Sequence, residues 1–195
     1  MKIHKETLKR IIKEELRRSL NERRVWGIGG AGIIVCCSED GTAFLQKRGA
    51  KVTGGAGQWA FPGGGIHPKG YSVKKHGVEA GHYETPISPE LQLPDDSPRF
   101  IETAFDELQE ETGWMPSKYE IVDSYLFVDG GFKYKTVIID VPLKVKQTYT
   151  KKVGQDEFSW ESTDEGWYTW EDMQQMKLFF GFTPELKQKV QNVIG

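Results

Sequence analysis

The stretch Phe105-Asp-Glu-Leu-Gln-Glu-Glu-Thr-Gly-Trp114 has the features of a helix end that carries several acidic side chains. Glu107, Glu110 and Glu111 stand at positions i, i+3 and i+4, and a helix therefore places all three carboxylates on one face. A second set of residues follows the same period and predicts a separate, apolar face: Ile101, Ala104, Phe105 and Leu108. The stretch therefore predicts an amphipathic helix with one acidic side.

Both ends of this helix are marked in the sequence. Ser97 is a favourable N-cap residue, and Pro98 suits the first helical position. Gly113 suits the position just past the end, where the backbone turns left-handed. The predicted helix thus runs from about residue 97 to 112.

The three carboxylates of the acidic face have two interpretations. Like charges three and four positions apart repel each other by a few tenths of a kcal/mol per exposed pair, and a solvated acidic face of this kind is common. A bound divalent cation would reverse the sign of that interaction, and oxygen-only ligands suit magnesium or manganese. The helix alone does not decide between the two interpretations.

A glycine cluster, Phe61-Pro-Gly-Gly-Gly-Ile66, precedes the helix. Gly63, Gly64 and Gly65 lack side chains, so their backbone can adopt positive φ and approach a ligand closely. Three glycines in a row usually indicate a turn. Their position ahead of an acidic helix makes them candidates for a ligand site.

The order of these two segments resembles the Nudix box, G-x5-E-x7-R-E-U-x-E-E-x-G-U, in which U is apolar. Residues 107–114, E-L-Q-E-E-T-G-W, match its second half at every fixed position, and residues 58–64 are similar to the usual approach to the box. The resemblance covers residues 27–182. It implies an α/β fold, a Nudix-like α-β-α sandwich with a mixed sheet, preceded here by an N-terminal amphipathic helix.

The chain departs from the box in three ways. From Gly64 to Glu107 there are 43 positions where the box has 15, so 28 extra residues fall within about residues 70–97. Gly70 stands where the box has a glutamate. Asp106 replaces the box arginine, which in the family pairs with a box carboxylate, and Arg99 or Lys69 is a candidate to compensate.

The insertion itself is best interpreted as a lid that reads the substrate. Loops of this length in compact domains are usually functional or else disordered. His76 and His82 offer a zinc site as an alternative, but no close Cys/His ligand spacing supports it.

The resemblance implies a hydrolase that cleaves the pyrophosphate bond of a nucleoside diphosphate linked to another moiety, with Mg²⁺ or Mn²⁺ as cofactor. The proposed metal ligands and catalytic carboxylates are Glu107, Glu110 and Glu111. A further catalytic glutamate is expected in the loop before a late short strand, with Glu161 favoured over Glu165 because Glu165 lies almost in the strand.

The resemblance also implies how the chain binds substrate. The backbone of Gly63, Gly64 and Gly65 is expected to accept the phosphate–metal cluster. Arg48 or its neighbour Lys47, at the end of the second strand, is expected to meet phosphate oxygens. The alternative, for which the sequence speaks equally, is that Lys47 and Arg48 are exposed charges at a strand end that bind no substrate.

A second function class stays open, because the Nudix fold also serves as a nucleotide-binding or sensor module without hydrolysis. The residues at 70 and 106 favour this catalytically weak alternative. The three intact glutamates oppose it. Magnesium-dependent turnover discriminates the two classes.

Residues 1–24 predict a basic amphipathic helix. Nine Lys or Arg residues outnumber four Glu, and an apolar stripe runs along one side through Leu8, Ile11, Ile12 and Leu16. Packing on its own domain, on a second copy or on a partner protein is the favoured role, and contact with a membrane surface or nucleic acid is the alternative. The helix also resembles the leader helix of tailed-phage proteins, which hints at a phage origin.

Composition bounds the remaining questions. The chain has 195 residues, 37% of them hydrophobic, and residues 25–195 suit one domain. The net charge of −2 indicates no general attraction to nucleic acid. The resemblance implies a small-molecule nucleotide as partner, and capped RNA is a possible substrate that the sequence does not indicate. No apolar run reaches membrane-span length and no signal peptide precedes the first strand. Adjacent Cys36 and Cys37 would point to opposite faces of a strand, which favours reduced thiols and a cytoplasmic setting.

The other elements follow from alternation and turn signals. Residues 25–32 are expected to form a joint, and residues 147–165 a polar loop. Strands are expected at 31–37, 42–48, 58–61, 119–128, 133–141 and 166–168. Helices are expected at 171–177 and after Thr183-Pro184.

Overall fold

A computed structural model of the chain describes residues 28–50, 52, 55–66, 92–129, 131–151 and 162–195. The predicted helix of residues 1–24, most of the insertion with its two histidines, and Glu161 lie outside these ranges. The expectations for those segments therefore stay predictions.

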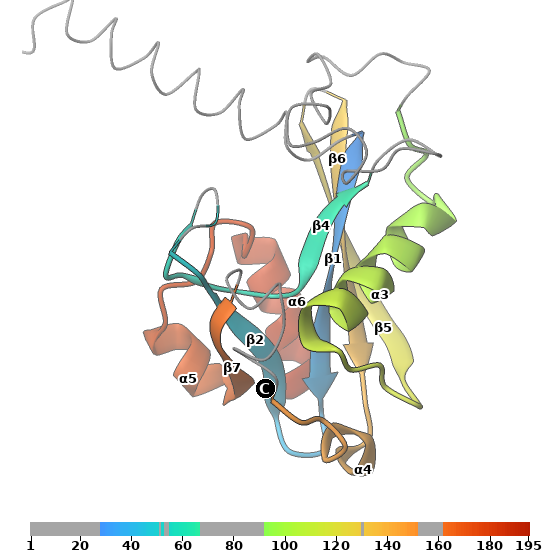
Figure 1. Cartoon of the computed structure of the whole chain (residues 1–195). Coiled ribbons are helices and arrows are strands. Elements are labelled where there is room, and N and C mark those ends of the chain that lie inside the picture. Colours follow the sequence, from blue (N-terminus) through green and yellow to red (C-terminus); the bar gives the residue numbers. More distant parts are fainter. Residues whose placement is uncertain (1–27, 51, 53–54, 67–91, 130, 152–161) are drawn as a thin grey trace, which may run out of the picture.

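One mixed sheet forms the centre of the molecule (Figure 1). Its strands are β1 (Gly29–Cys37), β2 (Thr42–Arg48), β3 (Trp59–Ala60), β4 (Gly63–Ile66), β5 (Glu120–Asp129), β6 (Phe132–Asp140) and β7 (Ser162–Thr169). The order is β3-β2-β1-β6-β5, with β4 beside the first half of β1 and β7 beside β2. The β1–β6 pair is parallel and the other paired strands are antiparallel, which gives the mixed sheet that the resemblance implies.

Helices cover both faces of this sheet. They are α3 (Pro98–Thr112), α4 (Leu143–Lys146), α5 (Trp170–Gln175) and α6 (Pro184–Ile194). α3 packs on one face, and α5 and α6 pack on the other. This arrangement is an α-β-α sandwich, and it confirms the predicted fold class.

The central strand β1 explains why both faces are covered. All nine of its residues are buried. Ile33 and Val35 belong to the core under α3, whereas Ile34 and Cys36 belong to the core under α6. Cys37 also lies on the α3 side, so the adjacent cysteines face apart and both are free, as predicted.

Two expectations about the strands are wrong. The glycine-rich residues 29–32 form no joint, because they begin β1 and pair with β4 in the register Gly29↔Ile66 to Gly32↔Gly63. β7 begins at Ser162 rather than at residue 166, since β2 is long enough to pair with it as far as Arg48. The polar loop expected up to residue 165 therefore ends earlier.

The C-terminal helix agrees with its prediction. Thr183 caps α6, and its hydroxyl accepts a hydrogen bond from the Leu186 amide at 3.2 Å. The buried side of α6 is Leu186, Val190 and Ile194, one residue per turn. α4 carries no local signal that the sequence analysis used, and it was not predicted.

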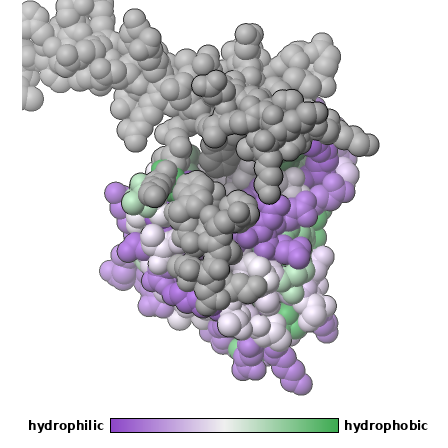
Figure 2. All heavy atoms as spheres, in the orientation of Figure 1, coloured by the Kyte–Doolittle hydropathy of each residue, from purple (hydrophilic) through white to green (hydrophobic). Residues whose placement is uncertain are grey.

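The surface on the α3 side of the sheet is largely polar. Figure 2 shows mostly hydrophilic residues over the α3 side of the molecule, where Glu102, Asp106 and Glu110 are exposed. Within the described ranges, no helix has the length and the apolar character needed to cross a membrane.

Candidate functional site

α3 is the rigid element that carries the acidic side chains. Phe100, Ala104 and Leu108 stand four residues apart and are fully buried against the sheet. Phe100 thus takes the place expected for Ile101, which is 38% exposed. The prediction of the apolar face is wrong by one residue at its start, because the pattern of apolar residues alone allowed either register.

The two ends of α3 differ from each other. Gly113 ends the helix in the left-handed conformation at φ 62°, and its amide donates to the Gln109 carbonyl at 2.8 Å, as predicted. Ser97 stands at the N-cap position, but its side chain makes no capping hydrogen bond, which corrects the expectation. Its amide instead donates to the Pro94 carbonyl at 3.0 Å.

Two lysines of β6 hold the segment that leads into α3. Lys133 Nζ donates to the Leu93 carbonyl at 2.7 Å and lies 2.6 Å from the Asp95 carboxylate. Lys135 Nζ donates to the Asp95 carbonyl at 3.0 Å. The Leu93 side chain is buried in the core under α3. The helix is therefore fixed on the sheet before its first turn.

Glu107 and Glu111 reach from α3 to the backbone of β4. A Cβ built at Gly64 would lie 2.1 Å from Glu107 Oε1, so the carboxylate occupies the space that a side chain would need. The Gly63 amide donates a hydrogen bond of 3.3 Å to Glu111 Oε1. Two carboxylates thus converge on adjacent glycines, which is the juxtaposition that the sequence predicted for helix and glycine cluster.

The glycines contribute in another way than expected. None of residues 63–65 has a positive φ, since they form β4 and pair with β1. They are needed for space: a Cβ at Gly63 would lie 2.3 Å from Tyr134 Oη, and one at Gly32 would lie 2.5 Å from the same oxygen. A floor of glycines on β1 and β4 therefore accommodates Tyr134.

The pKa of the Tyr134 hydroxyl is shifted by the groups around it. Burial raises the pKa of its hydroxyl, and the nearby carboxylates of Glu107 and Glu111 raise it further. Arg48 acts in the opposite direction but does not offset these effects. The phenol therefore stays protonated and can donate a hydrogen bond, in a field that favours a cation.

The third helix carboxylate, Glu110, and the later Glu165 have other surroundings than this pair. Glu110 is exposed. Among the residues that the structure describes, no three His, Cys, Asp or Glu side chains gather into a cluster that could hold a metal ion. Glu165 is buried within β7, where its carboxylate accepts from Gln46 Nε2 at 3.3 Å and raises the pKa of the buried Tyr149 hydroxyl in addition to the effect of burial.

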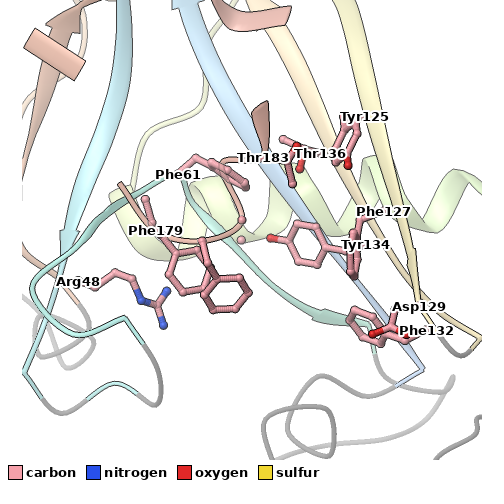
Figure 3. Close-up of a pocket in the computed structure, with 14 residues that line it drawn as sticks. Arg48, Phe61, Tyr125, Phe127, Asp129, Phe132, Tyr134, Thr136, Phe179 and Thr183 are labelled. Atoms are coloured by element: carbon pink, nitrogen blue, oxygen red, sulfur yellow. The ribbon is translucent and has the colours of Figure 1, made fainter. Parts of the chain in front are cut away.

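Next to the carboxylates a cavity of about 230 Å³ opens on the α6 face of the sheet. Tyr125 and Phe127 of β5 and Tyr134 of β6 form one wall (Figure 3). Phe179, opposite them, forms another wall together with Arg48, whose guanidinium carbon lies 4.7 Å from the centre of the Phe179 ring.

The cavity borders the strand on which the carboxylates converge, and Gly63 and Tyr134 belong to the surroundings of both. Gly63 lines the cavity, and its amide holds Glu111. Tyr134 also lines the cavity, and Glu107 and Glu111 shift its pKa. Arg48 was expected at the substrate, and the structure places it in this cavity at the end of β2.

The sequence analysis missed the aromatic residues of the cavity. Tyr125 and Phe127 alternate along β5, and Phe132 and Tyr134 alternate along β6, so each pair points to one face of the sheet. That alternation was a usable signal. The contribution of Phe179 was not, because it lies 45 positions farther along the chain than Tyr134.

Neither a protein-family model nor a curated protein matches the sequence. Solved structures are similar in fold. A Nudix hydrolase from M. smegmatis, RenU, superimposes with a TM-score of 0.53 at 15% identity, over 87% of this chain and 90% of that one. The NUDIX domain of Shewanella oneidensis NrtR, solved with ADP ribose, superimposes with a TM-score of 0.50 at 17% identity, over 85% and 87%. Together with the α-β-α sandwich and the helix that follows the glycine strand, these likenesses show that the chain has the Nudix fold.

Proposed function

We propose that this protein is a divalent-metal-dependent hydrolase that cleaves the pyrophosphate bond of a nucleoside diphosphate linked to another moiety. One observation carries the proposal: the carboxylates of Glu107 and Glu111 converge on the β4 backbone, whose Gly63 also lines a cavity of about 230 Å³. The likeness of this fold to a Nudix hydrolase supports the reaction class.

The residues at this point fit a hard divalent cation. Their donor atoms are carboxylate oxygens only, which suits Mg²⁺ or Mn²⁺. We propose Glu107 and Glu111 as ligands, joined by Glu110 one turn away and by Glu161, which directly precedes β7 in the sequence. A bound ion would neutralise diphosphate charge and acidify a water molecule.

Other groups of the protein would contact the substrate directly. The backbone of residues 63–65 borders the proposed phosphate position, as β4 lies between the carboxylates and the cavity. The Arg48 guanidinium would bind phosphate oxygens at the cavity mouth. The protonated Tyr134 hydroxyl would donate a hydrogen bond there, and Glu161 would serve as ligand or general base.

Turnover on a substrate panel tests the proposal. The panel contains ADP-ribose, NAD, dinucleoside polyphosphates, nucleoside triphosphates and capped RNA, each with and without magnesium. We expect magnesium-dependent release of phosphate or nucleotide from at least one. Glu111→Gln should lower that rate by at least about 100-fold, because even the loss of a residue that only hydrogen-bonds to a metal ligand costs up to about 100-fold. Exposed Glu102 on the same helix supplies the control Glu102→Gln.

A catalytically weak nucleotide-binding or sensor module is the second candidate. Asp106 favours it, because an acidic residue stands where the Nudix box has arginine and adds charge beside the glutamates. The NrtR domain that was solved with ADP ribose is a precedent for ligand binding by this fold. Tight nucleotide binding without turnover on the whole panel would establish this alternative.

Residues 1–24 extend the proposal beyond the catalytic domain of residues 25–195. Their basic amphipathic pattern supports docking on a second copy or on a partner protein. Sedimentation of the full chain and of a variant lacking residues 1–24 distinguishes self-association from a monomer.

The buried free thiols of Cys36 and Cys37 support a cytoplasmic setting.

A further inference from the structure

β5 is the last strand of the described sheet, and apolar side chains on its α3 side are in contact with water (Figure 1). Ile121 pairs with Ile139, which belongs to the core under α3, so Ile121 points to that same side. It is nevertheless 44% exposed. Leu126 packs partly against this core, and Val128, two positions farther on, is 55% exposed. The α3 side of β5 is therefore apolar but incompletely covered.

α3 adds apolar side chains beside that strand. Ile101 and Phe105 stand four positions apart and so share one side of the helix. The Phe105 ring lies 4.8 Å from the ring of Tyr119, which precedes β5, so this side of α3 faces β5. Tyr119 and Ile101 are exposed. We call the whole set the apolar strip: Ile101, Phe105, Tyr119, Ile121, Leu126 and Val128. Exposed apolar surface of this kind commonly marks an interaction site.

An acidic row borders the apolar strip on α3. It consists of three exposed residues that stand four positions apart, Glu102, Asp106 and Glu110. The first two directly follow Ile101 and Phe105 in the chain, so the acidic row lies next to the apolar side of the helix. A complementary partner is therefore an amphipathic helix that has cations at the same spacing beside its apolar face.

The sequence of residues 1–24 has this pattern. Three apolar residues stand four positions apart, and a cation directly follows each of them: Leu8-Lys9, Ile12-Lys13 and Leu16-Arg17. In the predicted helix, these cations form a basic row along one flank of the apolar stripe. With Leu20 the stripe would extend over roughly 18 Å at 1.5 Å per residue. The strip on β5 extends over roughly 23 Å from Ile121 to Val128, at about 3.3 Å per residue.

The direction of the two helices agrees with the point where the described chain begins. In both helices the charged row follows the apolar row by one residue, so the two charged rows face each other when the helices run antiparallel. Residue 24 then lies beside the first turn of α3. The described chain begins there, since a Cβ at Gly29 would lie 3.7 Å from the Phe100 ring. Residues 25–27 can span roughly 10 Å, which matches the roughly 8–10 Å between the axes of packed helices.

We propose that the apolar strip is the docking surface for residues 1–24 of the same chain, which lie antiparallel to α3 with the basic row against the acidic row. The pattern of residues 1–24 by itself suits a second copy or a partner protein equally. The start of the described chain beside α3 selects the same chain, because a tethered segment binds at a high effective concentration. Exposed ion pairs contribute little free energy, so the apolar contact holds the segment and the charges set its direction.

Carbodiimide cross-linking of the full chain tests the docking without substrate or metal. The reagent joins a lysine to a carboxylate that it contacts, and a mixture of unlabelled and isotope-labelled protein shows whether both groups belong to one chain. We expect Lys9 or Lys13 to be joined to a member of the acidic row within single chains. Products that combine labelled with unlabelled chains would overturn the proposal in favour of a second copy. The absence of any product between residues 1–24 and α3 would overturn the docking surface itself.

Trypsin cleavage within residues 1–24 measures how often the segment leaves the strip. Ile121→Ser should raise the cleavage rate about tenfold, the effect of removing one buried apolar side chain from the contact. Phe127→Ser is the control, since Phe127 is exposed on the same strand but points to the other side, where it lines the cavity. It should leave the rate unchanged. Equal cleavage of Ile121→Ser and wild type would contradict the docking.

A second pair of variants tests the other side of the contact. Ile12→Ser removes an apolar residue of residues 1–24 and should raise the cleavage rate as much as Ile121→Ser does. Glu14→Ser, two positions away and on the other side of the predicted helix, should leave it unchanged. Equal rates for these two variants would contradict the apolar contact. Neither experiment depends on turnover, so a failure of the docking and a failure of the hydrolase proposal are distinguishable.

Discussion

The Glu107 carboxylate lies directly against the backbone of Gly64, so that a Cβ at residue 64 would stand 2.1 Å from Oε1 of the glutamate. The amide of the preceding Gly63 donates to Glu111 at 3.3 Å. α3 and β4 therefore meet at this point through acidic side chains and bare backbone. The two glycines have different neighbours, and this difference leads to two contrasting predictions.

Gly64→Ala should lower activity much more than stability. The atoms that a Cβ would meet are the end of the flexible Glu107 side chain, which can rotate away, so we expect the free energy of unfolding to fall by less than about 1 kcal/mol. The displaced carboxylate should lower kcat/KM by about 100-fold, the effect of a misplacement of about 1 Å. Urea unfolding and magnesium-dependent turnover measure the two effects. Equal activity of variant and wild type would show that the position of Glu107 is immaterial.

Gly63→Ala should have the opposite balance and destabilise the fold. Its Cβ would lie 2.7 Å from the Ala31 carbonyl oxygen and 2.3 Å from Tyr134 Oη, and the strand backbone cannot move aside as a side chain can. We expect the free energy of unfolding to fall by about 1–3 kcal/mol. Urea unfolding tests this directly, and a variant as stable as wild type would refute the close packing of β4 on β1.

These glycines illustrate what the sequence could and could not predict. Local signals located α3, α6 and most strands, because apolar periodicity, a starting proline such as Pro98 and an ending glycine such as Gly113 each act on residues close to them in the chain. The contribution of Gly63 and Gly64 depends on Tyr134 and Glu107, which are distant in the chain. A run of glycines has the same sequence whether it serves a turn or leaves space for other side chains, so the positive φ was predicted wrongly.

The cavity could not be predicted from local sequence patterns for the same reason. β5 and β6 bring their aromatic residues together only because the two strands pair, and Phe179 comes from the segment before α6. The convergence of Glu107 and Glu111 on the glycines was predictable, since the box-like pattern fixes their order. The exposure of Glu110 was not.

Asp106→Arg should stabilise α3 and leave activity nearly unchanged. Asp106 stands four residues from both Glu102 and Glu110, and reversal of its charge turns two repulsive pairs into attractive ones. We expect the free energy of unfolding to rise by about 1 kcal/mol at low salt. A rate within about threefold of wild type, together with a lower rate for Arg99→Ala, would show that Arg99 replaces the box arginine. A large gain in rate would show that the box arginine is simply lost.

The ion pair between β5 and α6 should make stability depend on acid. Lys189 Nζ lies 2.7 Å and 2.9 Å from the two oxygens of Asp123. Although burial raises the pKa of Asp123, the Lys189 bond and the Ser124 amide outweigh it and lower that pKa. A carboxyl with a lowered folded-state pKa contributes stability that is fully present above its ordinary value of about 3.9 and is lost as pH falls through the folded value.

Asp123→Asn measures that contribution. It should lower the free energy of unfolding by about 0.5–1 kcal/mol at pH 7, the magnitude of a partly exposed ion pair. The difference from wild type should disappear at acid pH. Glu120→Gln, on the same strand and exposed, is the control and should change little. A deficit for Asp123→Asn that is the same at pH 7 and in acid would contradict the ion-pair account.

The central claim is that the Glu107 and Glu111 carboxylates form a divalent-cation site, and calorimetric titration with Mg²⁺ and Mn²⁺ tests it most directly. We expect wild type and the control Glu102→Gln to bind with the same affinity. The double variant Glu107→Gln/Glu111→Gln should bind at least about 100-fold more weakly while it keeps its fold. If the double variant binds both ions as tightly as wild type, the glutamates are a solvated acidic face and the proposed catalytic site is wrong.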